Sequence, residues 1–550
     1  MPKGVDKEKF EKFKKYYDPD IFREAGKRIR EMARVADNFT IEERIERIAA
    51  IFNTFRNPDK ETVLTPWRVV NMHLSDCLGG WCFYDEAFQQ NLSVPRWVSQ
   101  GQVTTDVFRP EAHVLEINSK SGLYPLYVAY SIYRSRVEQA KQKYGEVGHG
   151  FAKSLWDATI EENILVVCKT PMARSITRRT LAGFRKVRVN AQYYKDLIRN
   201  ISERPEAVVN TFRDGKHFWK INDNTNMKLD AIVGNPPYQE LDGGNNASAM
   251  PVYQHFVNVA RDIKPRYISM IMPSRWCVSG RGLDTFRESM LTDNHFAKMF
   301  DFRNGGDCFP GIRIGGGVCY ILWNSTYNDN MLEITNMPKT TVTPQIRPKK
   351  EFGLDFLIRD NIVRSIIYKV AAIGEPKMST LSFSQKPFGF RTNYMGYRES
   401  GEIKLYTKKE KDGFGYVSRE EITKNAEFID EWKVVTSRST SVPEEDNGQV
   451  LREVQTFISE PGSVVTESYV VVASFNDELL AKNCLSYLKT KFFRILCQVT
   501  IVSPDVSART FDLVPLQDFS RPWTDADLYA KYGLTEDEIA FIESMIKPME

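Results

Sequence analysis

The residues with the clearest chemical potential are the tetrapeptide Asn235-Pro236-Pro237-Tyr238, which follows Ala231-Ile232-Val233 and Gly234. The apolar run predicts a buried strand. The prolines end it, because each lacks an N–H donor and holds φ near one value. The result is a stiff loop at the carboxyl end of a strand, where open α/β sheets bind their ligands. On this loop stand an amide that donates and accepts hydrogen bonds and an aromatic ring that can stack. Together they could hold the edge and the face of a planar base.

The composition is that of a globular protein with more than one domain. The chain has 550 residues, 42% apolar and 27% charged, so two or three domains are expected. It has no run of 18 apolar residues, and its N-terminus lacks the apolar core of a secretory signal. Eight cysteines occur without a C-x-x-C pair, so we expect neither disulfides nor zinc, and a cytoplasmic location. The net charge of +4 permits nucleic-acid binding without demanding it.

The spacing of apolar residues divides the chain into three parts. Residues 1–58 are charged and predict a helical extension, with a helix at about 20–35 and another after a capping box at Thr40. Residues 59–328 alternate strands and helices, which predicts an α/β domain with a mainly parallel sheet covered on both faces. The aromatic residues at helical spacing in the extension are Phe10, Phe13, Tyr16 and Tyr17. The expected strands of the α/β domain are His113–Glu116, Ile164–Val167, Ala231–Val233, Tyr267–Met272 and Val318–Leu322.

Residues 329–550 have a different texture and predict an α+β domain. A polar linker with Pro338 and Pro344 precedes short strand-like pieces, a helix at about 477–496 and a last helix at about 535–546. Basic and aromatic residues alternate in Lys386–Arg391 and Asn393–Arg398, a pattern that suits phosphate and base-edge contacts. For any single residue a solvated β surface is the simpler interpretation. The candidate DNA-binding residues are Lys386, Arg391 and Arg398, with Arg347, Lys349 and Lys350 as candidate backbone contacts.

Five segments together resemble one family. Asn235–Tyr238 matches the (N/D/S)-P-P-(Y/F/W) motif of amino-methyltransferases that modify exocyclic nitrogens of DNA bases. Thr65-Pro66 resembles the T-P segment before their first strand, and Val114–Gly122 resembles their cofactor loop, usually (D/E)-P-x-x-G-x-G. Met270–Trp276 resembles the next strand and its loop, and Phe309–Ile312 resembles the late F-x-x-(V/I) motif. This order resembles the gamma-class N6-adenine DNA methyltransferases, TaqI-like enzymes and the methylase module of fused restriction–modification proteins.

The resemblance implies a Rossmann-like class I methyltransferase fold with a mixed seven-stranded sheet. It also implies a site-specific enzyme that moves a methyl group from S-adenosylmethionine to adenine N6. Asn235, Pro236, Pro237 and Tyr238 are the implied catalytic residues. The Asn235 side-chain carbonyl and the Pro236 main-chain carbonyl would accept the two N6 hydrogens and free the nitrogen lone pair. Because N6 cannot be reached inside a duplex, the base would be flipped out. Tyr238 would stack on one face of it, and Phe309 would lie on the other side.

Six residues are the implied contacts of the cofactor: Thr65, Pro66, Glu116, Asn118, Gly122 and Asp214, with Asp230 as an alternative to Asp214. Glu116 could receive the methionine ammonium group, and Gly122 allows close backbone approach. The chain departs from the family pattern at Lys120, where the loop usually has its first glycine. It departs again at Cys168-Lys169, where a carboxylate usually takes the ribose hydroxyls, with Glu161 or Glu162 as weak substitutes.

Several of these residues have an equally simple structural interpretation. Gly122 could be an ordinary turn glycine, Phe309 could belong to the core, and Asp214 is more simply a loop residue. A plain turn is the less favoured interpretation of the tetrapeptide, because the flanking segments occur in the family's order. The six histidines show no metal-ligand spacing, so no metal site is predicted.

The implied partner is double-stranded DNA, in a bacterial or phage restriction–modification system. A restriction or helicase subunit on another chain is a further expected partner. The chain itself shows no helicase motif, and Glu402-Ile403-Lys404 is too weak a nuclease signal. Two alternatives stay open. One is a catalytically weak or inactive DNA-binding subunit of a larger restriction complex. The other is methylation of cytosine N4, because the tetrapeptide serves both bases.

Overall fold

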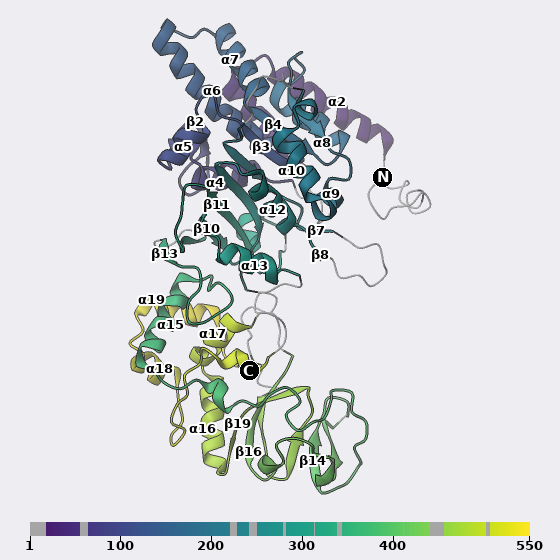
Figure 1. Cartoon of the computed structure of the whole chain (residues 1–550), viewed down its shortest axis with the longest axis vertical. Helices are drawn as coiled ribbons and strands as arrows, with labels where there is room; N and C mark the ends of the chain where they lie inside the picture. The colour runs from purple at the N-terminus through teal and green to yellow at the C-terminus, as the bar shows by residue number, and fades with distance from the viewer. Residues whose placement is uncertain are drawn as a thin grey trace. The chain divides into compact units, whose positions relative to one another are not determined.

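The computed structural model describes residues 11, 18–55, 64–220, 228–240, 250–278, 282–312, 314–337, 344–410, 412–439, 451, 456–501 and 506–549 (Figure 1). The chain divides into two compact units. Unit 1 comprises residues 1–273, 292–314 and 318–333, and unit 2 comprises residues 274–291, 315–317 and 334–550. The expected helical extension therefore falls in the same unit as the sheet. The functional roles of the three predicted parts stay predictions.

Unit 1 is built on a mixed sheet, and its strands are almost wholly buried. The strands of unit 1 follow the order β10-β11-β9-β6-β3-β4-β5. Neighbours from β9 to β5 are parallel, whereas β11 is antiparallel to both β9 and β10. The strand bounds are Val114–Ser119 (β3), Ile164–Cys168 (β4), Asn190–Tyr193 (β5), Ala231–Gly234 (β6), Tyr267–Pro273 (β9), Phe296–Phe302 (β10) and Val318–Asn324 (β11). The five predicted strands and the Rossmann-like α/β class are confirmed.

The sheet has nine strands rather than the predicted seven. β12 (Met331–Met337) and β13 (Gln345–Pro348) continue the strand order beyond β10. The prediction of a polar linker from residue 329 was wrong over β12. In this strand residues such as Leu332 and Ile334 are buried and alternate with more exposed polar ones, which is the pattern of a strand rather than of a linker. Of the two linker prolines, Pro344 precedes β13 and Pro338 lies outside the described residues.

Helices pack against this sheet and connect its strands (Figure 1). Those that position the site are α4 (Trp67–Cys77), α6 (Leu123–Tyr144), α7 (His149–Glu162), α8 (Pro171–Ala182) and α12 (Tyr253–Ile263). The smaller elements of unit 1 are α5 (Gln102–Val107), α9 (Leu197–Glu203), α10 (Pro205–Asp214), α11 (Lys216–Trp219), α14 (Gly305–Cys308) and the hairpins β1–β2 (Gly80–Tyr84, Asn91–Val98) and β7–β8 (Gln239–Glu240, Met250–Pro251). Because helices cover the sheet, its strands are buried and appear in the sequence as continuous apolar runs.

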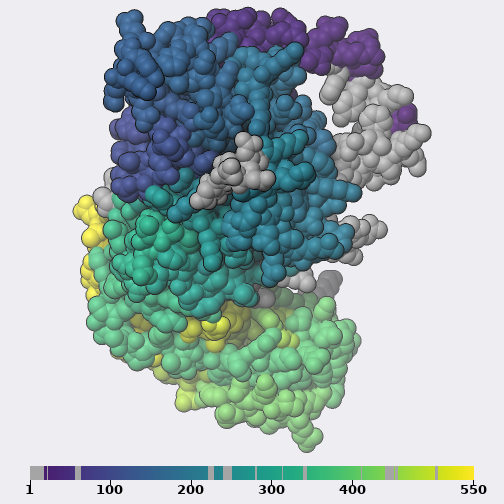
Figure 2. Space-filling model, turned by 45° about the horizontal axis from the view of Figure 1, so that its top comes forward, coloured from purple at the N-terminus to yellow at the C-terminus, as the bar shows by residue number. Residues whose placement is uncertain are grey.

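The N-terminal helices α2 (Pro19–Ala36) and α3 (Ile41–Asn53) are anchored to unit 1 rather than separate from it. Thr40 and Glu43 form the predicted capping box at the start of α3. Arg44, which is 2% exposed, pairs with Asp37 at 2.9 Å and donates to main-chain carbonyls of α8. Figure 2 shows α2, in purple, along the outside of this unit. The predicted aromatic stripe from Phe10 to Tyr17 lies outside the described residues.

Unit 2 has the predicted α+β character, with two three-stranded sheets. One contains β14 (Ile403–Tyr406), β15 (Phe414–Val417) and β18 (Ser463–Val465), and the other contains β16 (Trp432–Ser437), β17 (Thr456–Ser459) and β19 (Tyr469–Phe475). Its α-helices are α13 (Asp284–Leu291), α15 (Asn361–Ile373), α16 (Glu478–Lys489), α17 (Lys491–Thr500), α18 (Asp525–Lys531) and α19 (Glu536–Met545). The single helix predicted at 477–496 is two, because Thr490 ends α16 and its side chain caps α17 by accepting from the Phe493 amide.

Two expectations for unit 2 were wrong. Lys386–Arg391 is not a strand, because Lys386 (φ 57°) and Gly389 (φ 93°) adopt left-handed backbone that an extended ladder cannot hold. Arg347 and Lys349 do not offer their charges to a phosphate backbone, because they are 0% and 3% exposed. Arg347 instead pairs with Glu351 at 3.3 Å and donates to the Ile358 carbonyl. A buried guanidinium needs such partners, whatever its place in a basic sequence run.

Candidate active site

The carboxyl ends of the parallel strands bring two predicted motifs together. β3 and β6 are neighbours, and Glu116 of β3 lies directly opposite Val233 of β6. The tetrapeptide therefore leaves β6 beside the loop that follows β3. Gly234 has a φ of 155°, and a Cβ built on it would lie 3.1 Å from the Ile117 carbonyl oxygen. A glycine is needed here because the two strand ends approach so closely.

The side chain of Asn235 is held in one orientation. Its Nδ2 donates to Thr65 Oγ1 at 3.0 Å, and its main-chain carbonyl accepts from Asn118 Nδ2 at 3.4 Å. Its Oδ1 is buried and has no hydrogen-bond partner among the described residues. Because a buried carbonyl without a donor is costly, this oxygen is suited to a donor that a ligand supplies. An amino group is such a donor.

Glu116 and Asn118 form a second polar group at this edge. Both are buried, at 5% and 3% exposed, and Glu116 Oε2 and Asn118 Oδ1 have no partner among the described residues. Burial raises the pKa of Glu116 to about 8, against a lowering by the Ser119 side chain and the charge of Lys120. A cationic ligand group would favour the ionised carboxylate. The pair is therefore chemically suited to the ammonium group of an amino acid moiety.

Tyr238 lies next to the Asn235 side chain and Tyr124 lies near Glu116, both in an apolar setting. The Tyr238 hydroxyl is buried, and burial raises its pKa well above the ordinary value, against a lowering by the Asn235 side chain. The Tyr124 hydroxyl is hydrogen-bonded to His73 Nδ1 at 2.8 Å, and His73 Nε2 is 2.8 Å from Ser269 Oγ. Burial lowers the pKa of His73 to about 3, so this ring is neutral at physiological pH. The sequence did not single out His73 or Tyr124 as a site residue, because neither stands in a recognisable motif in α4 or α6.

Phe309 lies in the protein core, where the predicted stacking on a base would require its ring to become accessible. It is 1% exposed. The loop that carries it is tied to α4, because Arg68 Nη2 donates to the carbonyls of Asp307 at 3.0 Å and Cys308 at 3.2 Å. The helix that follows Thr65-Pro66 therefore holds the loop of the late motif. The base-stacking role of Phe309 stays a prediction.

Gly122 is required by helix packing. It has a φ of 79° at the start of α6, and a Cβ there would lie 3.0 Å from the Thr177 Cα of α8. We expect Gly122→Ala to lower the free energy of unfolding of unit 1 by about 2–4 kcal/mol, from left-handed strain and overpacking. Gly374→Ala is the control, because Gly374 has a similar φ of 74° with nothing within 4 Å of its Cβ. Its cost in unit 2 should be about 1 kcal/mol. Equal losses in urea unfolding would contradict the packing argument.

The two aspartates proposed for the adenosine end lie in different settings. Asp230 stands at the amino end of β6, where its two oxygens accept from Arg109 at 2.8 Å and from the His113 amide at 3.0 Å. It is 2% exposed, and the alternative that assigned it to the cofactor was wrong, because both oxygens are occupied at the opposite edge of the sheet. Asp214 ends α10 with its side chain 60% exposed, beside Arg213 at 2.8 Å. Its cofactor role stays a prediction.

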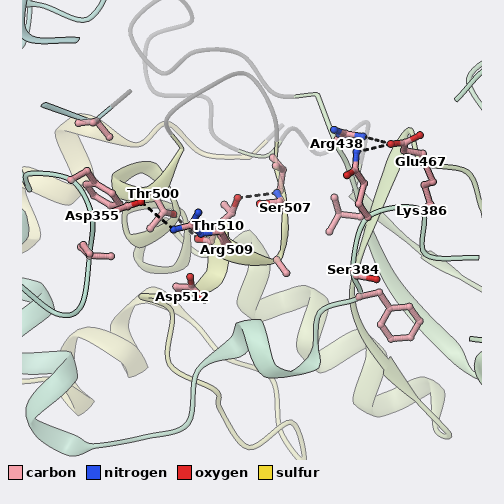
Figure 3. Close-up of a pocket in the computed structure, with 18 of the residues that line it drawn as sticks. Asp355, Ser384, Lys386, Arg438, Glu467, Thr500, Ser507, Arg509, Thr510 and Asp512 are labelled. Atoms are coloured by element: carbon pink, nitrogen blue, oxygen red, sulfur yellow. Dashed lines mark hydrogen bonds and ion pairs between the residues drawn. The ribbon is translucent and has the colours of Figure 1, made fainter. Parts of the chain in front are cut away.

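The candidate DNA-binding residues of unit 2 differ in their availability. Arg391 is exposed, and Arg398 pairs with Glu421 at 3.0 Å with its side chain 55% exposed. Lys386 lines a cavity of about 700 Å³ (Figure 3). Figure 3 shows Lys386 beside the Arg438–Glu467 ion pair (2.7 Å), with Asp355 and Arg509 at the other end of the cavity. The lining holds acidic as well as basic side chains, so charge alone does not identify a ligand there.

The described residues contain neither a metal-binding cluster nor a membrane-spanning helix. In the described ranges no three His, Cys, Asp or Glu side chains are placed to hold a metal ion. Across those ranges no helix is long and apolar enough to span a bilayer.

Part of this unit is similar to known proteins. Residues 162–309, which include β6 and Asn235–Tyr238, match the family described as Eco57I restriction-modification methylase. This stretch of the chain is therefore similar to a restriction-modification methylase. Over 175 residues it is 30% identical to a Mycoplasma pneumoniae protein named as an uncharacterized adenine-specific methylase. That match covers 30% of this chain, and the chain spans 41% of the length of that relative.

Solved structures of restriction-modification proteins are among those similar to this chain. A nuclease-deletion mutant of the Type ISP enzyme LlaGI, in complex with a DNA substrate mimic, is similar over 85% of this chain and 47% of its own, with 10% identity and a TM-score of 0.43. A modification subunit of a type I restriction enzyme from Vibrio vulnificus YJ016 is similar over 56% and 55%, with 9% identity and a TM-score of 0.34.

Proposed function

We propose that this protein is a site-specific DNA methyltransferase that transfers a methyl group from S-adenosylmethionine to adenine N6 in a restriction–modification system. The observation that carries the proposal is the fixed amide of Asn235. Its nitrogen is bonded to Thr65 and its carbonyl oxygen is buried without a donor, as an acceptor for an exocyclic amino group must be. The methylase family match over residues 162–309 supports it.

The Asn235 carbonyl and the Pro236 main-chain carbonyl accept the two hydrogens of N6. These hydrogen bonds draw the nitrogen towards tetrahedral geometry, so its lone pair is no longer delocalised into the ring. The acceptors are set in place before the reaction, so catalysis here is positional and electrostatic. Tyr238 stacks on the flipped-out base, and the rigid Pro237 fixes the ring relative to Asn235. After transfer the nitrogen releases one hydrogen as a proton to solvent.

S-adenosylmethionine supplies an electrophilic methyl group on a sulfonium centre. The buried unpartnered oxygens of Glu116 and Asn118 fit its amino acid end, and Glu116 in its ionised form would hold the ammonium group. Cys168 ends β4 and Lys169 follows it, where the family usually places a carboxylate, so the ribose hydroxyls lack that acceptor here. This departure favours weak cofactor binding and is the observation behind the second candidate, a DNA-binding subunit without catalysis.

Double-stranded DNA is the proposed substrate, with Lys386, Arg391 and Arg398 of unit 2 as DNA-binding residues. A tritium-transfer assay on adenine-containing DNA tests the proposal. Methyl transfer that requires both S-adenosylmethionine and the DNA is the expected result. DNA binding without transfer and without calorimetric binding of S-adenosylmethionine would select the second candidate instead.

Thr65 provides a test of how Asn235 is oriented. In Thr65→Val the Asn235 amide nitrogen loses its acceptor, so the amide is free to rotate its carbonyl away from the base. We expect kcat to fall about 10- to 100-fold, or about 1.4–2.7 kcal/mol. Thr65→Ser keeps the hydroxyl and should retain most of the activity. If Thr65→Val instead raised only the KM for S-adenosylmethionine, Thr65 would be a cofactor contact, as predicted from the sequence, and not a positioning residue.

A further inference from the structure

The positive charge of this chain is concentrated in one segment of unit 1. Between Glu162 and Asp196 the sequence contains eight lysines and arginines and no aspartate or glutamate, whereas the net charge of the whole chain is +4. The eight are Lys169, Arg174, Arg178, Arg179, Arg185, Lys186, Arg188 and Lys195. Such a run is usually a solvated surface, so its partners in the fold decide whether it binds a ligand.

This segment folds around the edge of the sheet away from the candidate active site. It forms β4, α8 and β5, and β4 and β5 are parallel neighbours. The chain therefore leaves β4 at the carboxyl edge, follows α8 back, and enters β5 from the amino edge. The loop from Gly183 to Val189 lies at the amino edge, whereas Asn235 lies at the carboxyl edge. Figure 1 shows α8 on the outer side of the sheet beside β4.

A concave pocket of about 410 Å³ lies along α8 and the loop after it. All of its lining residues lie between Pro171 and Val187, and none of them is acidic. We call this concavity the α8 pocket. Its basic side chains are Arg174, Arg178, Arg179, Arg185 and Lys186. A hollow with five cations on its walls focuses a positive potential.

Much of this charge has no compensating carboxylate. Arg178 and Lys186 are exposed and have no ion pair with any described residue. Arg185 has one ion pair, with Asp157, but its Nε and Nη2 are buried without a partner among the described residues. Arg174 uses its Nε for the Ala191 carbonyl at 2.9 Å. Arg174 and Arg178 are four residues apart on α8, so their like charges repel unless an anion lies between them.

The chemistry of these side chains fits phosphate better than carboxylate partners on a protein surface. Four of the five cations are arginines, whose planar forks bind phosphate oxygens in pairs and are weakly hydrated. The exposed Ser175 hydroxyl in the same lining can donate a further hydrogen bond. Phe184 is the aromatic residue of the lining and is covered by Arg179 at 4.2 Å and Arg34 at 5.0 Å, so it is not free to stack on a base. The pocket is equipped to hold a backbone and not to read a sequence.

We propose that the α8 pocket and its basic loop bind the phosphate backbone of a nucleic acid without sequence preference. The site lies along α8 and the loop at the amino edge of the sheet, and none of its lining residues belongs to the proposed methyl-transfer site. It contacts a stretch of nucleic acid other than the one that carries the target base. Its contribution is affinity that depends on salt.

The test uses the full-length protein and a duplex of about 30 base pairs of random sequence, with binding followed by fluorescence anisotropy between about 50 and 200 mM salt. The double variant Arg178→Gln/Lys186→Gln removes two exposed charges of the pocket. Because each phosphate contact contributes about 0.9 to the slope of log K against log salt, we expect the slope to fall by about 2. Binding at 100 mM salt should weaken at least about tenfold.

The matched control is Arg199→Gln/Arg213→Gln, which removes the same net charge from α9 and α10. Arg199 is exposed and Arg213 is half-buried, and each has an acidic neighbour, Glu203 and Asp214. We expect its slope to equal that of the wild type. Equal losses in both double variants would show an effect of bulk charge, and an unchanged slope in the pocket variant would assign the surface to another partner such as an acidic protein. Either result overturns the proposal.

Two further measurements distinguish backbone binding in the α8 pocket from binding of free phosphate and from DNA binding at the methyl-transfer site. Inorganic phosphate at a few millimolar and constant ionic strength should not displace the duplex, and displacement would show a site for free phosphate instead. Asn235→Ala should bind the random duplex with the wild-type salt slope. If Asn235→Ala loses methyl transfer but keeps the wild-type salt slope, the proposed backbone site is unaffected. The slope of the pocket variant therefore tests the backbone site independently of the chemistry at Asn235.

Discussion

Asn235→Ala is expected to lower methyl transfer to DNA by about 100- to 1,000-fold while the fold stays intact. The substitution removes the side-chain carbonyl that accepts one N6 hydrogen, so the nitrogen lone pair stays conjugated with the ring. The loss of one preorganised hydrogen-bonding group in an active site typically costs about 3–4 kcal/mol of transition-state stabilisation. It also removes the amide N–H from which Thr65 Oγ1 accepts. The cost to stability should be small, because the hydroxyl keeps its own O–H for a hydrogen bond.

Single-turnover transfer of a tritiated methyl group measures this loss directly. Binding of S-adenosylmethionine should change less than threefold, because the carbonyl of Asn235 faces the base and not the cofactor. Gln239→Ala is the control, since Gln239 is exposed two positions after the prolines and carries the same amide. A transfer rate for Asn235→Ala within tenfold of the wild type would contradict the assigned chemistry.

Binding of S-adenosylmethionine is expected to strengthen as the pH rises from 6 to about 8, because Glu116 must be ionised to hold the ammonium group. Burial raises the pKa of Glu116 to about 8, so the carboxyl is mostly protonated at pH 6. Each pH unit below this pKa should weaken binding by up to tenfold. Glu116→Gln should bind weakly and lose this pH dependence. Calorimetry at several pH values measures binding of S-adenosylmethionine to the wild type and to Glu116→Gln. If Glu116→Gln kept the same pH dependence, another group would be responsible for it.

The same raised pKa has a consequence for stability with a definite sign. Between the ordinary pKa of a glutamate, 4.5, and the folded value of about 8, the folded chain binds a proton at Glu116 that the unfolded chain has lost. The contribution of this group to the free energy of unfolding is therefore complete at low pH and falls as pH rises through this window. Glu116→Gln should remove this fall, so its unfolding free energy should depend less on pH between 5 and 8.

The sequence predicted the site best where local chemistry determines the backbone. The apolar run before Gly234 and the two prolines after Asn235 leave few conformations, so the strand and its terminal loop could be placed. The capping box at Thr40 and the central parallel strands were predictable for the same reason. Local signals failed where a partner is distant in sequence. The bond between Asn235 and Thr65 joins residues separated by 170 positions, and nothing near either residue indicates it.

Burial was the other property that the sequence did not show. Arg347 and Lys349 belong to a basic run that suggested a surface, yet they are buried and Arg347 is bound to Glu351. For Phe309 the sequence left the core and a base pocket open, and its ring is buried. For Gly122 it left a turn and cofactor approach open, and the atom nearest to an added Cβ belongs to Thr177 of α8. In each case the tertiary neighbour decides the role, and it comes from a different element.

The most direct test is modification-detecting sequencing of DNA from cells that express this protein, compared with cells that express Asn235→Ala. We predict N6-methyladenine within one recurrent sequence in the first sample and its absence in the second. N4-methylcytosine in place of N6-methyladenine would change the base and keep the chemistry. An unmodified genome in both samples, with the wild-type protein folded and S-adenosylmethionine present, would contradict the proposed methyl transfer.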